Sequence, residues 1–139
     1  MENKEILYIG LELTHDSAEK LLKVAKSVCT DIWRNSEREY KCHHMTIAFR
    51  RQIDQSVMEW FEKNEGKEFV MTAEKIGVSD KAVAVEVSTD CMSKNNIKHV
   101  TLAVNKSKGG KPVDSNGIKK WIKMKQPIRL KGKVKAYYK

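Results

Sequence analysis

The alternation of apolar and polar residues along the chain predicts β-strands in several segments, because successive side chains of a strand point to opposite faces. These segments are 5–13, 40–49, 68–78, 81–88, 97–104 and 127–138. Apolar residues at helical spacing predict an amphipathic helix over 17–29, begun by an N-cap at Asp16. Weaker patterns predict short helices after Asp54 and over 117–124. This order of elements favours an α+β domain with antiparallel sheet.

Two of the predicted strands contain the same short motif. The sequence HMTI occupies residues 44–47 and HVTL occupies residues 99–102. In each strand the His and the Thr two positions later share one face, and the apolar residues point to the other, into a core. If the two strands lie side by side or face each other, four polar side chains converge on one groove. These are His44, Thr46, His99 and Thr101.

This set of side chains suits acid–base chemistry on a phosphate ester. Two imidazoles can serve as general base and general acid, and two hydroxyls can donate hydrogen bonds to a phosphate oxygen. The set therefore predicts in-line attack of water on a phosphodiester, which requires no metal. A zinc site built from Cys42, His43 and the motif histidines is disfavoured, because adjacent strand residues diverge. On the same ground we expect His43 to point to the opposite face and to take no part in catalysis.

The two motifs resemble the H-x-T-x pair of the 2H phosphoesterase superfamily. The likeness is greatest to the cyclic phosphodiesterases of tRNA ligation and RNA repair, and to related phage enzymes that destroy cyclic oligonucleotides. It extends to the segments YIGLEL, KPVDSN and PIRLKG. The resemblance implies a bilobal fold, in which antiparallel sheets with flanking helices surround a central groove. It also implies that His44 and His99 are catalytic, and that Thr46 and Thr101 bind the phosphate.

The resemblance further implies the substrate. The leading prediction is metal-independent hydrolysis of RNA 2′,3′-cyclic phosphate ends, with no cofactor. One alternative is cleavage of 2′,5′-linked or cyclic oligonucleotide signals, as in viral evasion of host defence. An alternative of another class is a basic RNA-binding module without catalytic activity.

The net charge of +9 is concentrated at one end of the chain. All 18 Asp and Glu residues lie in 1–114, where equally many Lys and Arg residues balance them, and the charged residues of 115–139 are all basic. Such a region attracts phosphate backbones, although Lys residues also protect exposed edge strands. The residues proposed to contact the substrate are Tyr8, Ser115, Asn116, Trp121, Arg129 and Lys131.

The length of 139 residues predicts a single domain over 1–139. The three cysteines are odd in number and widely spaced, which favours free thiols in a reducing compartment. The sequence shows neither a signal-peptide pattern nor an apolar stretch long enough to span a membrane. We therefore expect a monomer in the cytoplasm, or in the host cytoplasm if the protein is viral, with no membrane partner.

Overall fold

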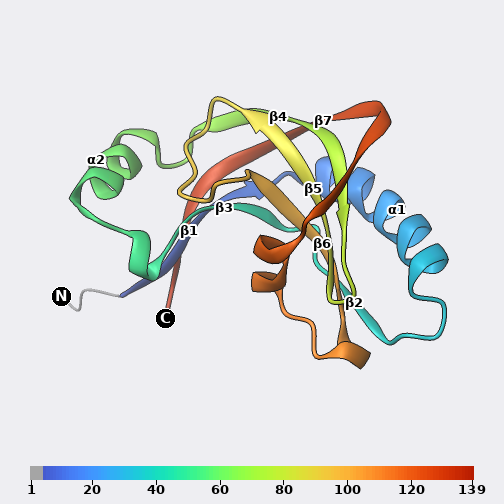
Figure 1. Cartoon of the computed structure of the whole chain (residues 1–139). Coiled ribbons are helices and arrows are strands. Elements are labelled where there is room, and N and C mark those ends of the chain that lie inside the picture. The colour runs from blue at the N-terminus through green and yellow to red at the C-terminus, as the bar shows by residue number, and fades with distance from the viewer. Residues whose placement is uncertain (1–4) are drawn as a thin grey trace.

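Seven strands and two α-helices make up residues 5–139, the part of the chain that the computed structural model describes (Figure 1). The strands are β1 (Ile6–Leu13), β2 (Arg38–Tyr40), β3 (His44–Phe49), β4 (Glu68–Val78), β5 (Ala82–Thr89), β6 (His99–Asn105) and β7 (Lys120–Tyr138). The helices are α1 (His15–Ile32) and α2 (Gln55–Asn64), with short 3-10 helices at Arg50–Gln52, Lys106–Lys108 and Pro112–Gly117.

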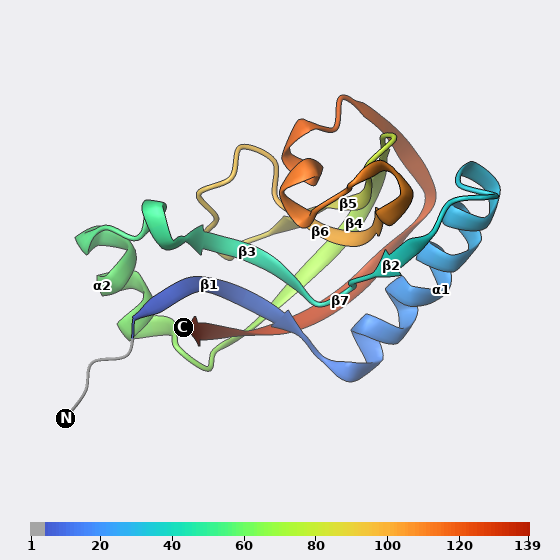
Figure 2. The same cartoon turned by 90° about the horizontal axis from the view of Figure 1, so that it is seen from below.

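Six of the strands close into one antiparallel barrel. Around the barrel the order is β6-β3-β1-β7-β4-β5, and β5 pairs again with β6. The short strand β2 extends the sheet beside β6, on the edge that also faces β3. Figure 2 shows α1 along one side of the barrel, beside β2 and β7, and α2 at the opposite end.

The expected bilobal α+β fold is wrong, because the strands form a single closed barrel. The long strand β7 explains the difference: it pairs with β4 over most of its length and with β1 through its C-terminal half. One strand thus joins what would otherwise be two separate sheets, and the β5–β6 pairing completes the ring. Alternation predicts where strands lie, but it does not predict which of them pair.

The predicted helix over 117–124 is also wrong. Residues Pro112–Gly117 form a 3-10 helix, and β7 begins at Lys120. Trp121 pairs with Gly77 of β4, where a Cβ atom would lie only 2.6 Å from the Trp121 ring. The missing side chain of Gly77 therefore makes room for Trp121, and tertiary pairing overrides the local helical pattern.

The first long helix agrees with the prediction apart from its two ends, since α1 spans His15–Ile32 where the pattern predicted 17–29. Thr14, not Asp16, is the N-cap, and its Oγ1 accepts a hydrogen bond from the Ser17 amide at 3.4 Å. The buried stripe of α1 consists of Ser17, Leu21, Ala25 and Cys29. Within residues 5–139 neither α-helix is long and apolar enough to cross a membrane.

The apolar residues of the two motifs lie in the barrel core, as alternation predicted. Met45, Ile47, Val100 and Leu102 are all 0 % exposed. Burying a side chain of this size stabilises the fold by about 1.5–3 kcal/mol. The burial of these four apolar residues therefore anchors β3 and β6 in the barrel, and it also turns the alternate, polar residues away from the core.

Replacing Met45 tests how far the core depends on the motif strands. Met45→Ala should lower the free energy of unfolding by about 2–5 kcal/mol, because it removes buried apolar surface and leaves a cavity. The measurement is urea unfolding followed by circular dichroism. Ile32→Ala is the control, since Ile32 is 43 % exposed and its loss should cost less than about 0.5 kcal/mol. Equal losses in the two variants would contradict the assignment of Met45 to the core.

Candidate functional site

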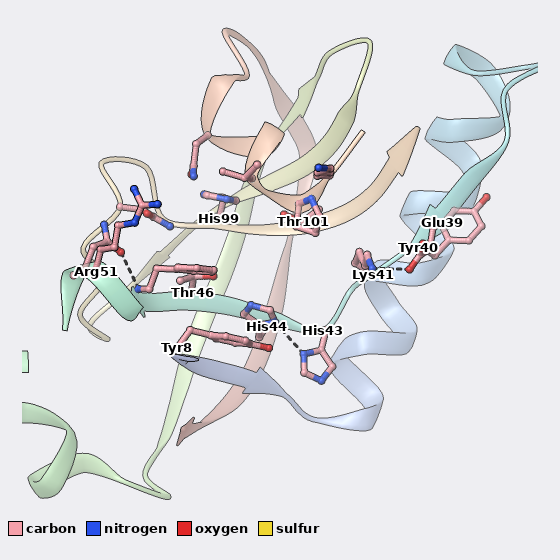
Figure 3. A pocket seen from close by; sticks show the side chains of 17 residues that line it. Tyr8, Glu39, Tyr40, Lys41, His43, His44, Thr46, Arg51, His99 and Thr101 are labelled. Carbon is pink, nitrogen blue, oxygen red and sulfur yellow. Dashed lines mark hydrogen bonds and ion pairs between the residues drawn. The ribbon is translucent and has the colours of Figure 1, made fainter. Parts of the chain in front are cut away.

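The pairing of β3 with β6 brings the two motifs together. Met45 lies opposite Val100 in antiparallel register. The residues on either side of this pair point away from the core, so that His44 lies towards Thr101 and Thr46 towards His99. All four polar residues line one cavity of about 1000 Å³ (Figure 3). The expected convergence is thus present, and the catalytic role of the four residues stays a prediction.

The imidazole of His44 is held by aromatic and histidine neighbours. Tyr8 of β1 stacks on it, with ring centroids 5.0 Å apart and an angle of 28° between the planes. Gly10 leaves room for the ring, because a Cβ atom there would lie 3.2 Å from His44 Cδ2. The Nδ1 atoms of His43 and His44 are 2.9 Å apart and share a hydrogen bond. This bond occupies Nδ1 of His44, so Nε2 is the nitrogen left for a substrate.

Burial, together with the nearby imidazoles of His43 and His99, lowers the pKa of His44 to about 4 against the opposing effect of Glu12. His44 is therefore neutral at pH 7. In the tautomer that donates its Nδ1 proton to His43, Nε2 carries a free lone pair. Such a nitrogen can accept a proton from water.

His99 presents its Nε2 atom in a different way. Its Nδ1 lies 2.8 Å from the carbonyl oxygen of Ile97. A carbonyl oxygen only accepts hydrogen bonds, so Nδ1 carries the proton. Nε2 then either accepts a proton or, in the imidazolium form, donates one. The ring is 8 % exposed, and this fixes its orientation.

Each of the two threonines forms a hydrogen bond with a serine from a neighbouring segment. Thr101 Oγ1 lies 2.8 Å from the Oγ of Ser115, which is 2 % exposed. The carbonyl of Thr46 accepts a hydrogen bond of 2.8 Å from Ser93 Oγ. Both hydroxyls can donate to an anionic oxygen in the cavity.

His43 lies on the same side as His44 and lines the same cavity, so the prediction that it points to the opposite face is wrong. Cys42 has φ of 48° and lies before the start of β3, which interrupts the alternation. Cys42 turns inward and its Sγ lies 3.6 Å from the Leu102 carbonyl. Burial raises the pKa of this thiol to about 12, so it is not a thiolate nucleophile at neutral pH.

The sequence reasoning missed Phe49, which is 58 % exposed at the cavity. Strict alternation from Met45 and Ile47 would place it in the core. The β1–β3 register instead shifts between Ile9 and Gly10, and Ala48 joins Ile47 in the core. This bulge turns Phe49 to the cavity side, where it stacks on Tyr8 with centroids 6.0 Å apart.

Basic side chains also line the cavity although the motifs do not predict them. Lys41, Arg51 and Lys111 are all exposed there. Glu39 neutralises part of this charge, because its carboxylate pairs with Lys41 at 2.6 Å. The one hint of these basic residues in the sequence was that Arg51 lies shortly after the first motif.

Four of the six residues predicted to contact the substrate line a cavity, and two do not. Tyr8 and Asn116 line the large cavity, while Ser115 and Trp121 line a smaller one beside it. Arg129 and Lys131 line neither cavity. Their backbones instead contact α1, since the Lys20 ammonium donates to the Arg129 carbonyl and the Lys131 amide donates to Ser17 Oγ.

Within residues 5–139 no three His, Cys, Asp or Glu side chains are grouped so that they could hold a metal ion. The site therefore offers nitrogen and hydroxyl groups for proton transfer and hydrogen bonding.

Comparison with known proteins shows the fold. No protein-family model matches the sequence, and no curated protein matches it. Among solved structures the chain is similar to one described as "Crystal Structure of Fungal RNA Kinase", with a TM-score of 0.70 and 12 % identity. The match covers 100 % of this chain and 47 % of the other, so the chain spans about half the length of that protein.

This match corrects the expected family. The sequence motifs resemble those of the 2H phosphoesterase superfamily, but membership of that superfamily is wrong as a prediction. The structural likeness is to part of a fungal RNA kinase, and the strands form one closed barrel instead of two lobes.

The lowered pKa of His44 predicts a dependence of stability on pH. An unfolded His has a pKa of about 6.5, whereas His44 in the folded protein has a pKa of about 4. Between these values the unfolded state binds more protons, so stability falls as the pH decreases from 6.5 to 4, by up to about 1.4 kcal/mol per pH unit. Urea unfolding at pH 7, 6 and 5 measures it. His44→Gln should lose less stability over this range than the parent, and parallel losses would refute the assignment.

Proposed function

We propose that the protein is a phosphodiesterase that hydrolyses 2′,3′-cyclic phosphate ends of RNA or oligonucleotides, with His44 and His99 as its acid–base pair. The observation that carries the proposal is the shared cavity, in which two imidazoles and two Thr hydroxyls meet across the β3–β6 pair. Acid–base assistance of this kind accelerates a reaction by about 10²–10⁴ for each group.

The two histidines take different roles because their surroundings differ. His44, whose pKa is lowered to about 4, accepts a proton from water through Nε2. The water oxygen forms a bond to phosphorus, and the bond from phosphorus to one ribose oxygen breaks. His99 in its imidazolium form gives its Nε2 proton to that leaving oxygen. One water is consumed and a phosphomonoester remains on the ribose.

The other cavity residues fit a nucleotide phosphate. The hydroxyls of Thr46 and Thr101 can donate to the non-bridging oxygens, where negative charge is held in the transition state. Arg51 and Lys111 add positive charge to the same cavity. These groups attract an anionic substrate and oppose its release before reaction.

Aromatic side chains support a nucleic-acid substrate. Phe49 and Tyr8 present stacked rings at the cavity, and nucleobases stack on such rings at about 1–3 kcal/mol per base. The structurally similar protein is described as an RNA kinase. This likeness favours RNA over other phosphodiesters as the substrate.

Removing either imidazole tests the catalytic proposal. His44→Ala and His99→Ala should each lower kcat by about 10²–10⁴, while substrate binding changes little. The assay follows hydrolysis of oligoribonucleotides that end in a 2′,3′-cyclic phosphate, and fluorescence anisotropy follows binding. His15→Ala is the matched control, because His15 is exposed on α1 and does not line the cavity.

The same assay separates an enzyme from a binding module. If the parent protein binds RNA but turns over neither cyclic phosphates nor 2′,5′-linked or cyclic oligonucleotides, the enzyme proposal fails. A basic RNA-binding module then accounts for the charge.

Metal removal gives a further test. Treatment with EDTA followed by desalting should leave kcat unchanged, because the proposed proton transfers use only imidazole nitrogens. Readdition of Mg²⁺, Mn²⁺ or Zn²⁺ should not raise it. A loss of activity that one of these ions restores would show that a metal takes part in the reaction.

A further inference from the structure

A second cavity adjoins the large one at His99. It has a volume of about 430 Å³. Four residues line both cavities, namely Gln52, Asn95, His99 and Asn116. His99 therefore stands at the junction of two spaces, and a ligand larger than a single nucleotide can occupy both at once.

The wall of the second cavity suits a nucleobase. Its amide side chains come from Gln52, Asn95, Asn96 and Asn116. Each amide has both a donor and an acceptor, as the edges of nucleobases do. Lys94 adds one positive charge, and none of the residues that line this cavity is acidic.

The loop between β5 and β6, which carries Lys94, Asn95 and Asn96, is fixed to the barrel. Ser93 Oγ donates to the Thr46 carbonyl at 2.8 Å, and the Lys94 amide donates to the Ile47 carbonyl at 2.7 Å. Lys98 Nζ binds the carbonyls of Thr89 and Cys91 at 2.9 and 2.7 Å. The loop is thus anchored at both of its ends, so binding need not order it first.

Trp121 also lines this cavity, and its position is fixed as well. Its Nε1 donates to the Ile118 carbonyl at 3.2 Å, and its ring lies over Gly77 of β4. A half-buried aromatic ring in this position offers an apolar surface to a base. Trp121 and the loop therefore form a small preformed pocket.

We propose that this second cavity, the Asn96 cavity, binds a second nucleotide of the substrate. The proposal rests on the proposed function and narrows it: the substrate is an oligonucleotide of at least two nucleotides. A cyclic mononucleotide fills the large cavity beside His44 and leaves the Asn96 cavity empty. In an oligonucleotide the neighbouring nucleotide passes His99, where its base meets the amides and its phosphate meets Lys94.

The test compares substrates that differ by one nucleotide. The kcat/KM of a dinucleotide ending in a 2′,3′-cyclic phosphate should exceed that of the cyclic mononucleotide at least tenfold. Asn96→Ala and Lys94→Ala should each reduce this ratio by about 3- to 10-fold, since each removes one polar contact of the second nucleotide. Both residues are exposed, so their loss should not unfold the protein. Lys26→Ala, an exposed and charge-matched change on α1, should leave the ratio unchanged.

A binding measurement separates this proposal from the proposed function. Calorimetry compares a dinucleotide 3′-phosphate with a mononucleotide 3′-phosphate, neither of which reacts. If the parent hydrolyses both substrates equally well and both variants keep that ratio, the second subsite is refuted and the phosphodiesterase stands. If the dinucleotide binds more tightly through Asn96 and Lys94 but nothing is hydrolysed, the subsite stands and the phosphodiesterase is refuted.

Discussion

The contact between Met45 and Val100 connects the fold with the site. It is the pair through which β3 and β6 meet in the barrel, and both side chains are fully buried. Because strand side chains alternate, burial of this pair turns the residues on either side of it outwards. The hydrophobic driving force that closes the barrel therefore also sets the directions of His44, Thr46, His99 and Thr101. A slip of one residue in either strand would put polar groups into the core.

The histidines gain their different properties from the strands around them. His44 lies over the glycine of β1 and under Tyr8, where it is buried enough for its pKa to fall. His99 begins β6 and uses a backbone carbonyl to fix its proton. Two copies of one motif thus reach two different states, because each strand meets different neighbours. The proposed acid–base pair needs one imidazole that accepts a proton and one that donates it, and the different contacts of the two rings suit this division.

The strand pattern of the sequence predicted the core face of the two motifs, and the four polar residues that would share a cavity if the two strands met. The core face depends only on the alternation of two short runs, and the burial of Met45 and Val100 confirms it. The shared cavity depends in addition on the pairing of β3 with β6, which is a tertiary contact. What failed depends on interruptions of the alternation. The positive φ of Cys42 turns His43 to the cavity, and the bulge beside Ala48 turns Phe49 there.

Long-range pairing was the other limit. Trp121 lies in a segment whose local pattern suggests a helix, yet it pairs with a glycine of β4 in the long strand β7. Nothing within the segment encodes that partner. The bilobal fold was wrong for the same reason, since the closure of the barrel depends on contacts between residues that are distant in the sequence. Local periodicity predicts individual strands and helices, whereas the closure of the barrel depends on which strands pair with one another.

Most of the basic residues of 115–139 do not lie at the two cavities, although they provide the net charge of the protein. The net charge of +9 equals the charge of residues 115–139, because 1–114 are balanced. Four basic residues of β7 nevertheless line neither cavity, namely Arg129, Lys131, Lys133 and Lys135. Part of this charge is neutralised, because Lys135 pairs with Glu12 at 3.5 Å.

The basic side chains that do line the cavities come from the part of the chain whose charges balance. These are Lys41, Arg51, Lys94 and Lys111, which all lie in 1–114, where acids and bases are equal in number. Distant charge raises the encounter rate with any polyanion and is screened by salt within about 10 Å. Charge inside a cavity acts at contact distance and depends on where the phosphate lies. If the protein acts on RNA, as proposed, the basic strand raises the rate of capture in general, and the side chains inside the cavities discriminate between substrates.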